Sequence, residues 1–145
     1  MADAVERLVV LWSSAGEAVG PRLSAQQLRA LKVVRHRSEL NLTALAEILG
    51  IALPAASRLC DRLEAAGLLE RVPHPGNRRE LQLLLTPQGR LVLTEIAERR
   101  SLSLASVLAA MSPAQRVSLE SGLLGFHRAL DAASAEPERK DHAGQ

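Results

Sequence analysis

Two short amphipathic segments on either side of a glycine, between residues 43 and 67, constrain the fold more than any other feature of the sequence. In the first segment Thr43 is placed to cap a helix, and the apolar residues that follow share one helical face: Leu45, Ala46, Ile48 and Leu49. Gly50 suits a sharp turn, and Pro54 suits the first turn of a second helix. We expect that helix to run to about residue 66, with three residues facing inward: Leu59, Leu63 and Ala66. Gly67 then provides a left-handed C-terminal cap, so the pattern predicts two helices joined by a tight turn.

A β-hairpin is predicted directly after this pair. Residues 68–72 are a short strand candidate, and residues 80–86 alternate polar and apolar side chains before an apolar run, as a return strand does. The intervening residues 73–77 read Pro-His-Pro-Gly-Asn and are dense in turn formers, so we expect a long tip that carries arginines.

Four further helices are expected around this unit. They are indicated by helical periodicity and by capping residues: residues 3–19 ending at Gly20-Pro21, a helix opened by Ser24 and Gln27, residues 87–110 after Thr86, and a last helix opened by Ser112 and Gln115. From Ala133 onward the apolar period is lost, so we expect residues 133–145 to form a flexible tail.

Helix, tight turn, helix and basic hairpin together make a winged helix-turn-helix, which we place at residues 21–86. The fold class is therefore mainly α with a small β-hairpin wing. In this arrangement the second helix fits the major groove of DNA, and the hairpin reaches the neighbouring backbone or minor groove.

The charge distribution agrees with a DNA-facing middle segment. The net charge is only +2, but residues 21–79 contain ten basic and five acidic residues and so carry +5. The rest of the chain contains eight basic and eleven acidic residues and so carries −3. Charge alone leaves open the alternative that arginine-rich helices are simply solvated.

Candidate DNA contacts lie on the outward side of the second helix and on the wing. They are residues that can bond bases or phosphates or touch a thymine methyl: Pro54, Ala55, Ser57, Arg58, Arg62, Arg78 and Arg79. An arginine can bond guanine O6 and N7 in bidentate fashion, which makes Arg58 the principal candidate. For Arg62 the alternative is an ion pair with Asp61, Glu64 or Glu70 that only holds the fold.

Two runs of sequence resemble the MarR (multiple antibiotic resistance regulator) family. The first covers residues 45–51 and 57–71, and the second is the wing, where residues 77–86 follow the family's Asp-x-Arg…Leu-Thr pattern with Arg79 at the motif arginine. The resemblance extends to the Thr86-Pro87-x-Gly89 and Ser112-Pro113 helix starts.

The resemblance implies a homodimeric transcription regulator, most simply a repressor bound to a palindromic operator. Residues 1–20 and 87–132 would form a helical dimerisation region, and Arg79 would enter a minor groove. Three apolar helices also have more hydrophobic surface than one small lobe can cover, which agrees with a dimer.

The sequence departs from the family pattern at two positions. Asn77 stands where the family has an aspartate, so an ion pair with the wing arginines is lost, although an amide can still bond the loop backbone. Leu53 precedes Pro54 where a serine or threonine cap is common, so the first N–H groups of the second helix should lack a side-chain partner. Phosphate oxygens could satisfy those groups when DNA binds.

Several function classes are excluded or disfavoured by composition. With only Trp12 and Phe126 as aromatic residues, the chain lacks the platforms that stack single-stranded bases. A single cysteine and four dispersed histidines (His36, His74, His127 and His142) indicate neither a disulfide framework nor a metal site, and no catalytic motif is found. We therefore expect a non-enzymatic protein without cofactors. The N-terminus does not look like a signal peptide and no apolar run is long enough for a membrane helix, so we expect a cytoplasmic protein.

A small-molecule effector that releases the DNA is implied only by the resemblance. Trp12, Arg35 and His36 are candidate pocket residues, with the alternative that Trp12 belongs to the core. With so few aromatics we expect an aliphatic effector or none. Cys60 is interpreted as a packed thiol rather than as a redox sensor.

The sequence thus predicts a protein that binds double-stranded DNA and itself. The alternative is a winged-helix module for protein–protein interaction without specific DNA binding. The two differ in salt dependence, because phosphate contacts weaken steeply as salt rises.

Overall fold

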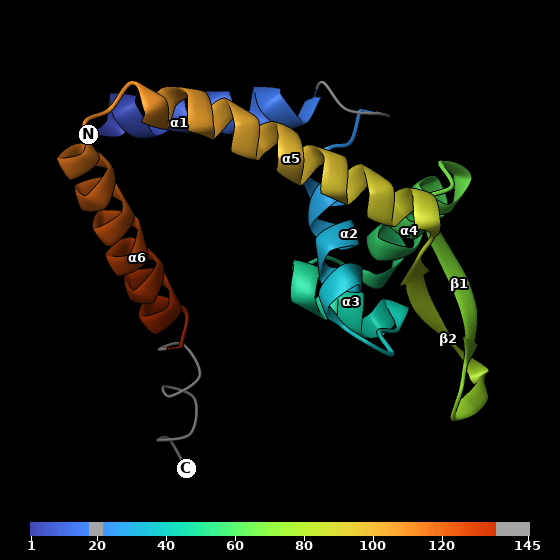
Figure 1. Ribbon diagram of the computed structural model, residues 1–145. Coiled ribbons are helices and arrows are strands. Elements are labelled where there is room, and N and C mark those ends of the chain that lie inside the picture. Colours follow the sequence, from blue (N-terminus) through green and yellow to red (C-terminus); the bar gives the residue numbers. More distant parts are fainter. Residues whose placement is uncertain (18–21, 136–145) are drawn as a thin grey trace, which may run out of the picture. The chain divides into compact units, whose positions relative to one another are not determined.

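The computed structural model describes residues 1–17 and 22–135, and it contains two compact units, residues 1–104 and 105 onward. The elements, in chain order, are α1 (Ala2–Glu17), α2 (Ala25–His36), α3 (Leu42–Leu49), α4 (Leu53–Ala65), β1 (Leu69–His74), β2 (Asn77–Leu85), α5 (Pro87–Ala109) and α6 (Pro113–Ala135) (Figure 1). This mainly helical chain with one antiparallel hairpin confirms the predicted fold class. The predicted end of the first helix, Gly20-Pro21, lies outside the described residues.

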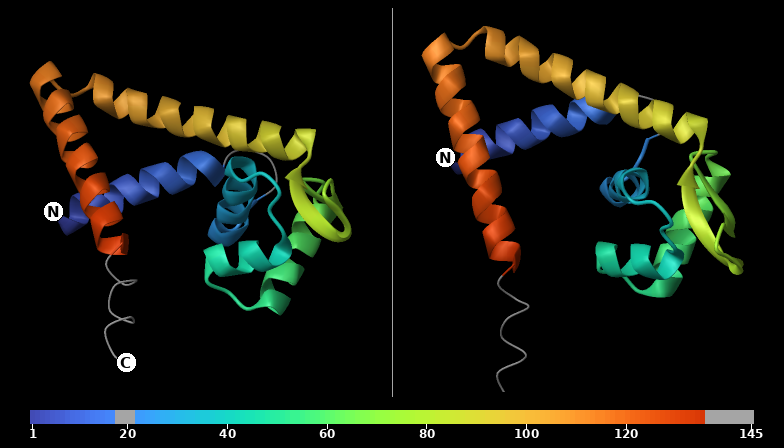
Figure 2. Two further views of the ribbon diagram at one scale, coloured as in Figure 1. Left: turned by 90° about the horizontal axis from the view of Figure 1, so that it is seen from below. Right: turned by 60° about the horizontal axis from the view of Figure 1, so that its bottom comes forward.

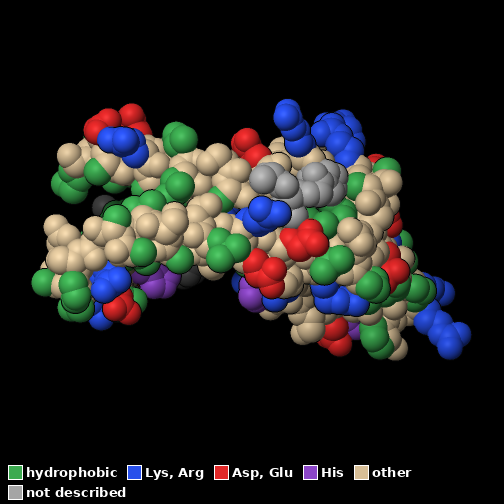
Figure 3. Space-filling view, turned by 45° about the horizontal axis from the view of Figure 1, so that its top comes forward, with side chains coloured by type: hydrophobic (Ala, Val, Ile, Leu, Met, Phe, Trp, Pro, Cys, Tyr) green, Lys and Arg blue, Asp and Glu red, His purple; other side chains and the backbone are tan. Residues whose placement is uncertain are grey.

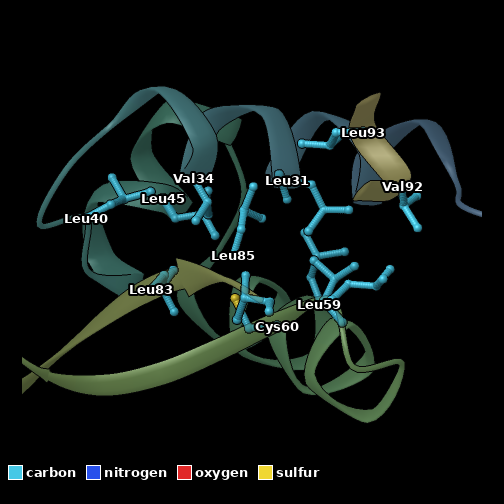
Figure 4. Close-up of a cluster of buried hydrophobic side chains, with 14 of the residues drawn as sticks. Leu31, Val34, Leu40, Leu45, Leu59, Cys60, Leu83, Leu85, Val92 and Leu93 are labelled. Atoms are coloured by element: carbon cyan, nitrogen blue, oxygen red, sulfur yellow. The ribbon is translucent and has the colours of Figure 1, made fainter. Parts of the chain in front are cut away.

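One hydrophobic core holds α2, α3, α4, the hairpin and the first half of α5 together. Figure 4 shows side chains from these elements pointing into a common interior, among them Leu31, Leu45, Leu59 and Leu83. The Leu83 N–H also donates to the Leu40 carbonyl over 2.7 Å, which attaches β2 to the segment before α3. The hairpin projects past α4 in Figure 1 and lies beside it in the right view of Figure 2, so the core sets the position of the wing relative to that helix.

The turn between α3 and α4 forms as the sequence predicts, except at its first cap. Gly50 adopts a left-handed conformation (φ 66°), and its N–H donates to the Ala46 and Glu47 carbonyls. The prediction that Thr43 caps α3 is wrong, because the helix starts two residues earlier than that cap implies, at Leu42. Asn41 occupies the cap, where its Oδ1 accepts the Ala44 N–H over 2.8 Å.

The ends of α4 differ from the prediction by one position each. Ala52 is the N-cap residue and makes no side-chain hydrogen bond, so the predicted lack of a side-chain cap is confirmed, but at Ala52 rather than Leu53. At the other end Ala66 is an exposed C-cap residue, so its predicted inward orientation is wrong. Gly67 follows with φ 71°, as expected for a left-handed cap. The buried face of α4 contains four residues: Ala56, Leu59, Cys60 and Leu63.

The predicted long tip of the hairpin is wrong. β1 extends through Pro73 and His74, and only Pro75 and Gly76 link it to β2. Pro73 is tolerated because each strand of a two-stranded sheet is an edge strand, where a missing N–H need not break a ladder bond. The register shifts between Pro73 and His74, which pair with Leu81 and Asn77 respectively.

The start of α5 is locked to the end of α4 by Thr86 and Gly89. The Thr86 hydroxyl donates to the Gly67 carbonyl over 2.6 Å and accepts the Gly89 N–H over 3.0 Å, which confirms the predicted helix start. Gly89 is buried, and a Cβ at this position would lie 2.0 Å from the Leu68 carbonyl oxygen. Only glycine therefore permits α5 to pass this close to the strand.

α1 and α6 expose most of their apolar residues. None of the described side chains on either helix is buried, although Ser112 and Gln115 form the predicted capping box at the start of α6. The last helix continues to Ala135, so the predicted start of the tail at residue 133 is wrong, and residues 136–145 lie outside the described part of the chain. Green hydrophobic side chains accordingly appear across the surface in Figure 3.

No single helix in residues 1–17 and 22–135 is long and apolar enough to cross a membrane. α3 and α4 reach the required length and composition only when they are joined, and they are bent by 108° at their junction.

Candidate nucleic-acid interface

α4 presents two exposed arginines on the side that faces away from the core. Arg58 and Arg62 lie about one turn apart, and neither takes part in an ion pair with any described residue. Pro54 is exposed as well, and Ala55 and Ser57 are half-buried beside them. The alternative in which Arg62 pairs with a neighbouring carboxylate is therefore wrong, and both guanidinium groups are available to a ligand.

The carboxylates of α4 are occupied by Arg71 instead. Arg71 Nη2 lies 3.0 Å from Asp61 Oδ1, Arg71 Nη1 donates to Glu64 Oε2, and the Arg71 N–H donates to Glu64 Oε1 over 3.1 Å. Burial lowers the pKa of Arg71, but the hydrogen bond that Arg71 donates to Asp61 and the charge of Glu64 outweigh burial and raise this pKa above its ordinary value. These bonds tie α4 to β1, and they hold Asp61 and Glu64 away from Arg58 and Arg62.

Sequence reasoning missed the role of Arg71. A signal was present, since Asp61 and Glu64 are three residues apart on one helix and Arg71 is the first basic residue of the following strand. Acidic pairs at this spacing share a helix side and can bind one guanidinium group.

The wing carries the second pair of arginines. Arg78 and Arg79 are exposed on β2, and Asn77 Oδ1 accepts the Arg79 N–H over 3.2 Å. The amide that replaces the family's aspartate thus bonds the wing backbone, as predicted. Lys and Arg side chains project at the wing end of the face shown in Figure 3.

The uncapped start of α4 gives a first prediction. Ala52→Ser should supply a side-chain acceptor for the free N–H groups of the first turn and raise the free energy of unfolding by about 1 kcal/mol. Chemical denaturation measures this change, and Ala65→Ser, at the exposed last residue of the helix, is the control that should give no gain. If phosphates satisfy these N–H groups in the complex, Ala52→Ser should also weaken DNA binding at low salt. Unchanged stability would show that the N–H groups of the first turn already have hydrogen-bond partners.

The predicted effector-pocket residues do not line one pocket. Arg35 lines a depression of about 500 Å³ with residues of α5: Thr94, Ala97, Glu98, Ser101 and Leu102. Trp12 instead contacts Arg100, whose guanidinium carbon lies 5.0 Å from the indole centroid and whose Nε donates to the Trp12 carbonyl over 3.0 Å. His36 is exposed at the end of α2 and lines neither this depression nor the pocket beside Arg100.

A smaller pocket of about 170 Å³ adjoins Arg100. It is lined by three polar side chains and by aliphatic and small residues of α1, α2, α5 and the segment before α2: Ser13, Gly16, Glu17, Leu23, Ala25, Leu28, Ile96 and Arg100. Arg100 is only 9% exposed and forms no ion pair with a carboxylate among the described residues. Burial lowers the pKa of Arg100, and burial together with the Arg100 charge lowers the pKa of Lys32. Arg100 and Lys32 thus raise the positive potential here, and the Glu17 carboxylate, which also lines the pocket, forms no ion pair with either of them.

Cys60 is packed in the core, as predicted. Its side chain is fully buried, and burial is the largest cause of the raised pKa of its thiol. The thiol therefore stays protonated at neutral pH, which disfavours reaction with oxidants.

The described histidines lie on different elements and are not gathered into a metal site. His74 and His127 each lie beside one carboxylate, Glu39 and Asp131 respectively. Within residues 1–17 and 22–135 no group of three metal-ligating side chains occurs, and His142 lies outside that part of the chain.

A model of the MarR family matches residues 23–81, which span α2, α3, α4 and most of the hairpin. Residues 23–81 of this chain are a MarR-family domain. The chain is 28% identical over 114 residues to an uncharacterized HTH-type transcriptional regulator, YfiV of Bacillus subtilis, covering 79% of this chain and 71% of YfiV. It is 30% identical over 77 residues to the multiple antibiotic resistance protein MarR of Salmonella typhimurium, and the match spans 53% of this chain and 54% of that protein.

Solved structures share the fold of this chain. RV1404 from Mycobacterium tuberculosis is 34% identical and superposes with a TM-score of 0.82 over 88% of each chain. FabT of Streptococcus pneumoniae, solved in complex with DNA, has the same fold at 19% identity, with a TM-score of 0.70 over 91% of this chain and 93% of FabT. MarR-family proteins are transcription regulators and not enzymes, which confirms the prediction of a non-enzymatic regulator.

Proposed function

We propose that this MarR-family regulator binds double-stranded DNA in a sequence-specific manner and represses transcription from a palindromic operator in the cytoplasm. α4 enters the major groove, where Pro54, Ala55, Ser57, Arg58 and Arg62 face the bases and phosphates, and Arg78 and Arg79 of the wing reach the flanking minor groove. One observation carries the proposal. Two exposed arginines without ion pairs lie on a helix that Arg71 fixes to an arginine-bearing hairpin.

The acting species in this proposal is a homodimer. Three helices in the predicted dimerisation region, residues 1–20 and 87–132, expose large apolar side chains: Val5, Val9, Val10, Leu91, Leu102, Val107, Val117, Leu124, Phe126 and Leu130. Apolar surface on this scale favours burial against an identical copy. Two-fold symmetry would place the two α4 helices roughly 34 Å apart, one turn of DNA, and residues 21–86 would form each DNA-binding lobe.

Salt titration tests the DNA-binding proposal against the alternative of a protein-binding module. The affinity for duplex DNA, measured by fluorescence anisotropy, should fall with a log–log slope of about −0.9 for each phosphate contact. Four arginines on each lobe lead us to expect a steep slope. Arg58→Ala combined with Arg62→Ala should make the slope shallower. A weak association that does not change with salt would contradict DNA binding and favour the protein-binding alternative.

We also infer that the pocket beside Arg100 receives the effector, and that the effector is a small aliphatic acid. Aliphatic side chains line much of the pocket, and Arg100 and Lys32 supply positive charge. Glu17 lines the pocket as well, but no described carboxylate forms an ion pair with either cation. Short-chain fatty acids should therefore release the operator, and salicylate should be weaker. Arg100→Gln should abolish the response to the acid but keep DNA affinity. Release by the acid that Arg100→Gln does not alter would rule out this pocket.

A further inference from the structure

The tip of the wing contains a bulge that holds both of its arginines. Pro73 pairs with Leu81 in the β1–β2 register, and the next residue of β1, His74, pairs with Asn77. Three consecutive residues of β2 therefore have no partner on β1: Arg78, Arg79 and Glu80. A bulge changes the direction in which a strand presents its side chains. The direction of the two arginines thus depends on whatever holds the bulge.

His74 contacts two other segments at one end of this bulge. Its Nδ1 accepts the Gly76 N–H over 3.0 Å, and its Nε2 lies 3.6 Å from Oε2 of Glu39. Because Nδ1 is the acceptor, the ring proton is assigned to Nε2, which faces the carboxylate. The imidazole thereby joins the turn of the wing to the loop between α2 and α3.

Glu39 occupies an unusual backbone conformation in that loop. Its φ is 58°, and no other non-glycine residue in the described part of the chain has a positive φ. This region is unfavourable for a residue with a Cβ, and such conformations persist where the surrounding structure enforces them. The strained residue is the one whose carboxylate faces His74.

We propose that His74 is a positioning residue that holds the wing turn against Glu39 and so directs Arg78 and Arg79 toward DNA. At the other end of the turn the Asn77 side chain holds the Arg79 N–H, so the arginine-bearing bulge is fixed from both sides. The inference rests on the proposed DNA-binding function, but it assigns a role to a residue that acts through the wing arginines.

A double-mutant cycle separates positioning from simple stabilisation of the turn. His74→Ala should weaken operator binding by about three- to ten-fold, a coupling typical of residues that act together. In a background of Arg78→Ala and Arg79→Ala, the same substitution should change the affinity by less than about two-fold, since no wing arginine is left to direct. The melting temperature of each variant checks that substitutions at the exposed tip do not destabilise the fold.

Two substitutions test the contacts of the two ring nitrogens of His74 separately. An asparagine side chain can accept the N–H two residues later, as Nδ1 does, whereas glutamine extends toward the Nε2 position. His74→Asn should restore the turn but not the contact with Glu39, and His74→Gln should do the reverse. We expect each to recover part of the affinity, and Glu39→Gln in the His74→Asn background to have no further effect. His127→Ala, which removes a histidine 3.5 Å from Asp131 on α6, is the matched control and should leave the wing's contribution unchanged.

The outcomes distinguish this inference from the proposed function. The positioning role would be overturned if His74→Ala lowered the operator affinity equally with and without the wing arginines. It would also be overturned if His74→Ala did not lower the affinity when both arginines are present. DNA binding would stand in either case. A wild-type protein that shows no preference for any duplex would instead contradict the proposed function itself.

Discussion

Gly89→Ala is expected to destabilise the protein more than the same substitution at any other glycine in the described part of the chain. The new Cβ would lie 2.0 Å from the Leu68 carbonyl oxygen, and that oxygen is backbone and already accepts the Thr86 N–H over 3.2 Å. Neither partner can rotate away, so α5 or β1 must shift. Overpacking costs about 3 kcal/mol at the upper end of its usual range, and the better helix propensity of alanine returns about 1 kcal/mol. We expect a net loss of about 2 kcal/mol or more in the free energy of unfolding.

Denaturant titration at equilibrium measures this loss. Gly122→Ala is the matched control, because Gly122 is also helical but a Cβ there meets no atom within 4 Å. That control should be neutral or stabilising by up to about 1 kcal/mol. Equal stability of Gly89→Ala and the wild type would show that the junction between β1 and α5 is looser than the structure has it.

Arg58→Ala is expected to cause the largest change in sequence preference. Arg58 is exposed on α4 without an ion-pair partner, so its guanidinium can bond a guanine O6 and N7 at no cost in broken internal contacts. Loss of such a bidentate contact should cost about 1–3 kcal/mol at one base pair of each half-site and little elsewhere.

A base analogue makes the assignment specific. With 7-deazaguanine at the contacted position, wild-type affinity should fall, whereas Arg58→Ala should bind the analogue and guanine equally well. Arg116→Ala, at an exposed position on α6, should keep the wild-type preference. If Arg58→Ala weakens all sequences alike, the residue contacts phosphate and does not read a base.

Local signals in the sequence were sufficient for most of the fold. Gly50 and Gly67 take left-handed conformations at the two helix ends where the sequence predicts them, and both Ser-x-x-Gln capping boxes form. These features depend on a few neighbouring residues, so the sequence alone determines them.

The errors arose where local alternatives compete or where distant residues decide. Asn41 and Thr43 are both acceptable caps, and the tertiary contact of Leu40 with β2 favours the earlier helix start. The dense turn formers of residues 73–77 suggested a loop, but pairing with β2 continues through Pro73. The spacing of Asp61 and Glu64 was a signal for the role of Arg71, but the bonds that confirm it join a helix to a strand in the folded chain. The separation of Trp12 from Arg35 involves elements that meet only in the folded chain, so no local pattern could indicate it.

Selection of bound duplexes from a random pool is the most direct test of the central claim. The account predicts that the purified protein enriches a palindrome whose half-sites are centred about one helical turn apart, each with a guanine that Arg58→Ala no longer selects. Enrichment of no sequence, or of a site without two-fold symmetry that Arg58→Ala recognises equally well, would contradict it.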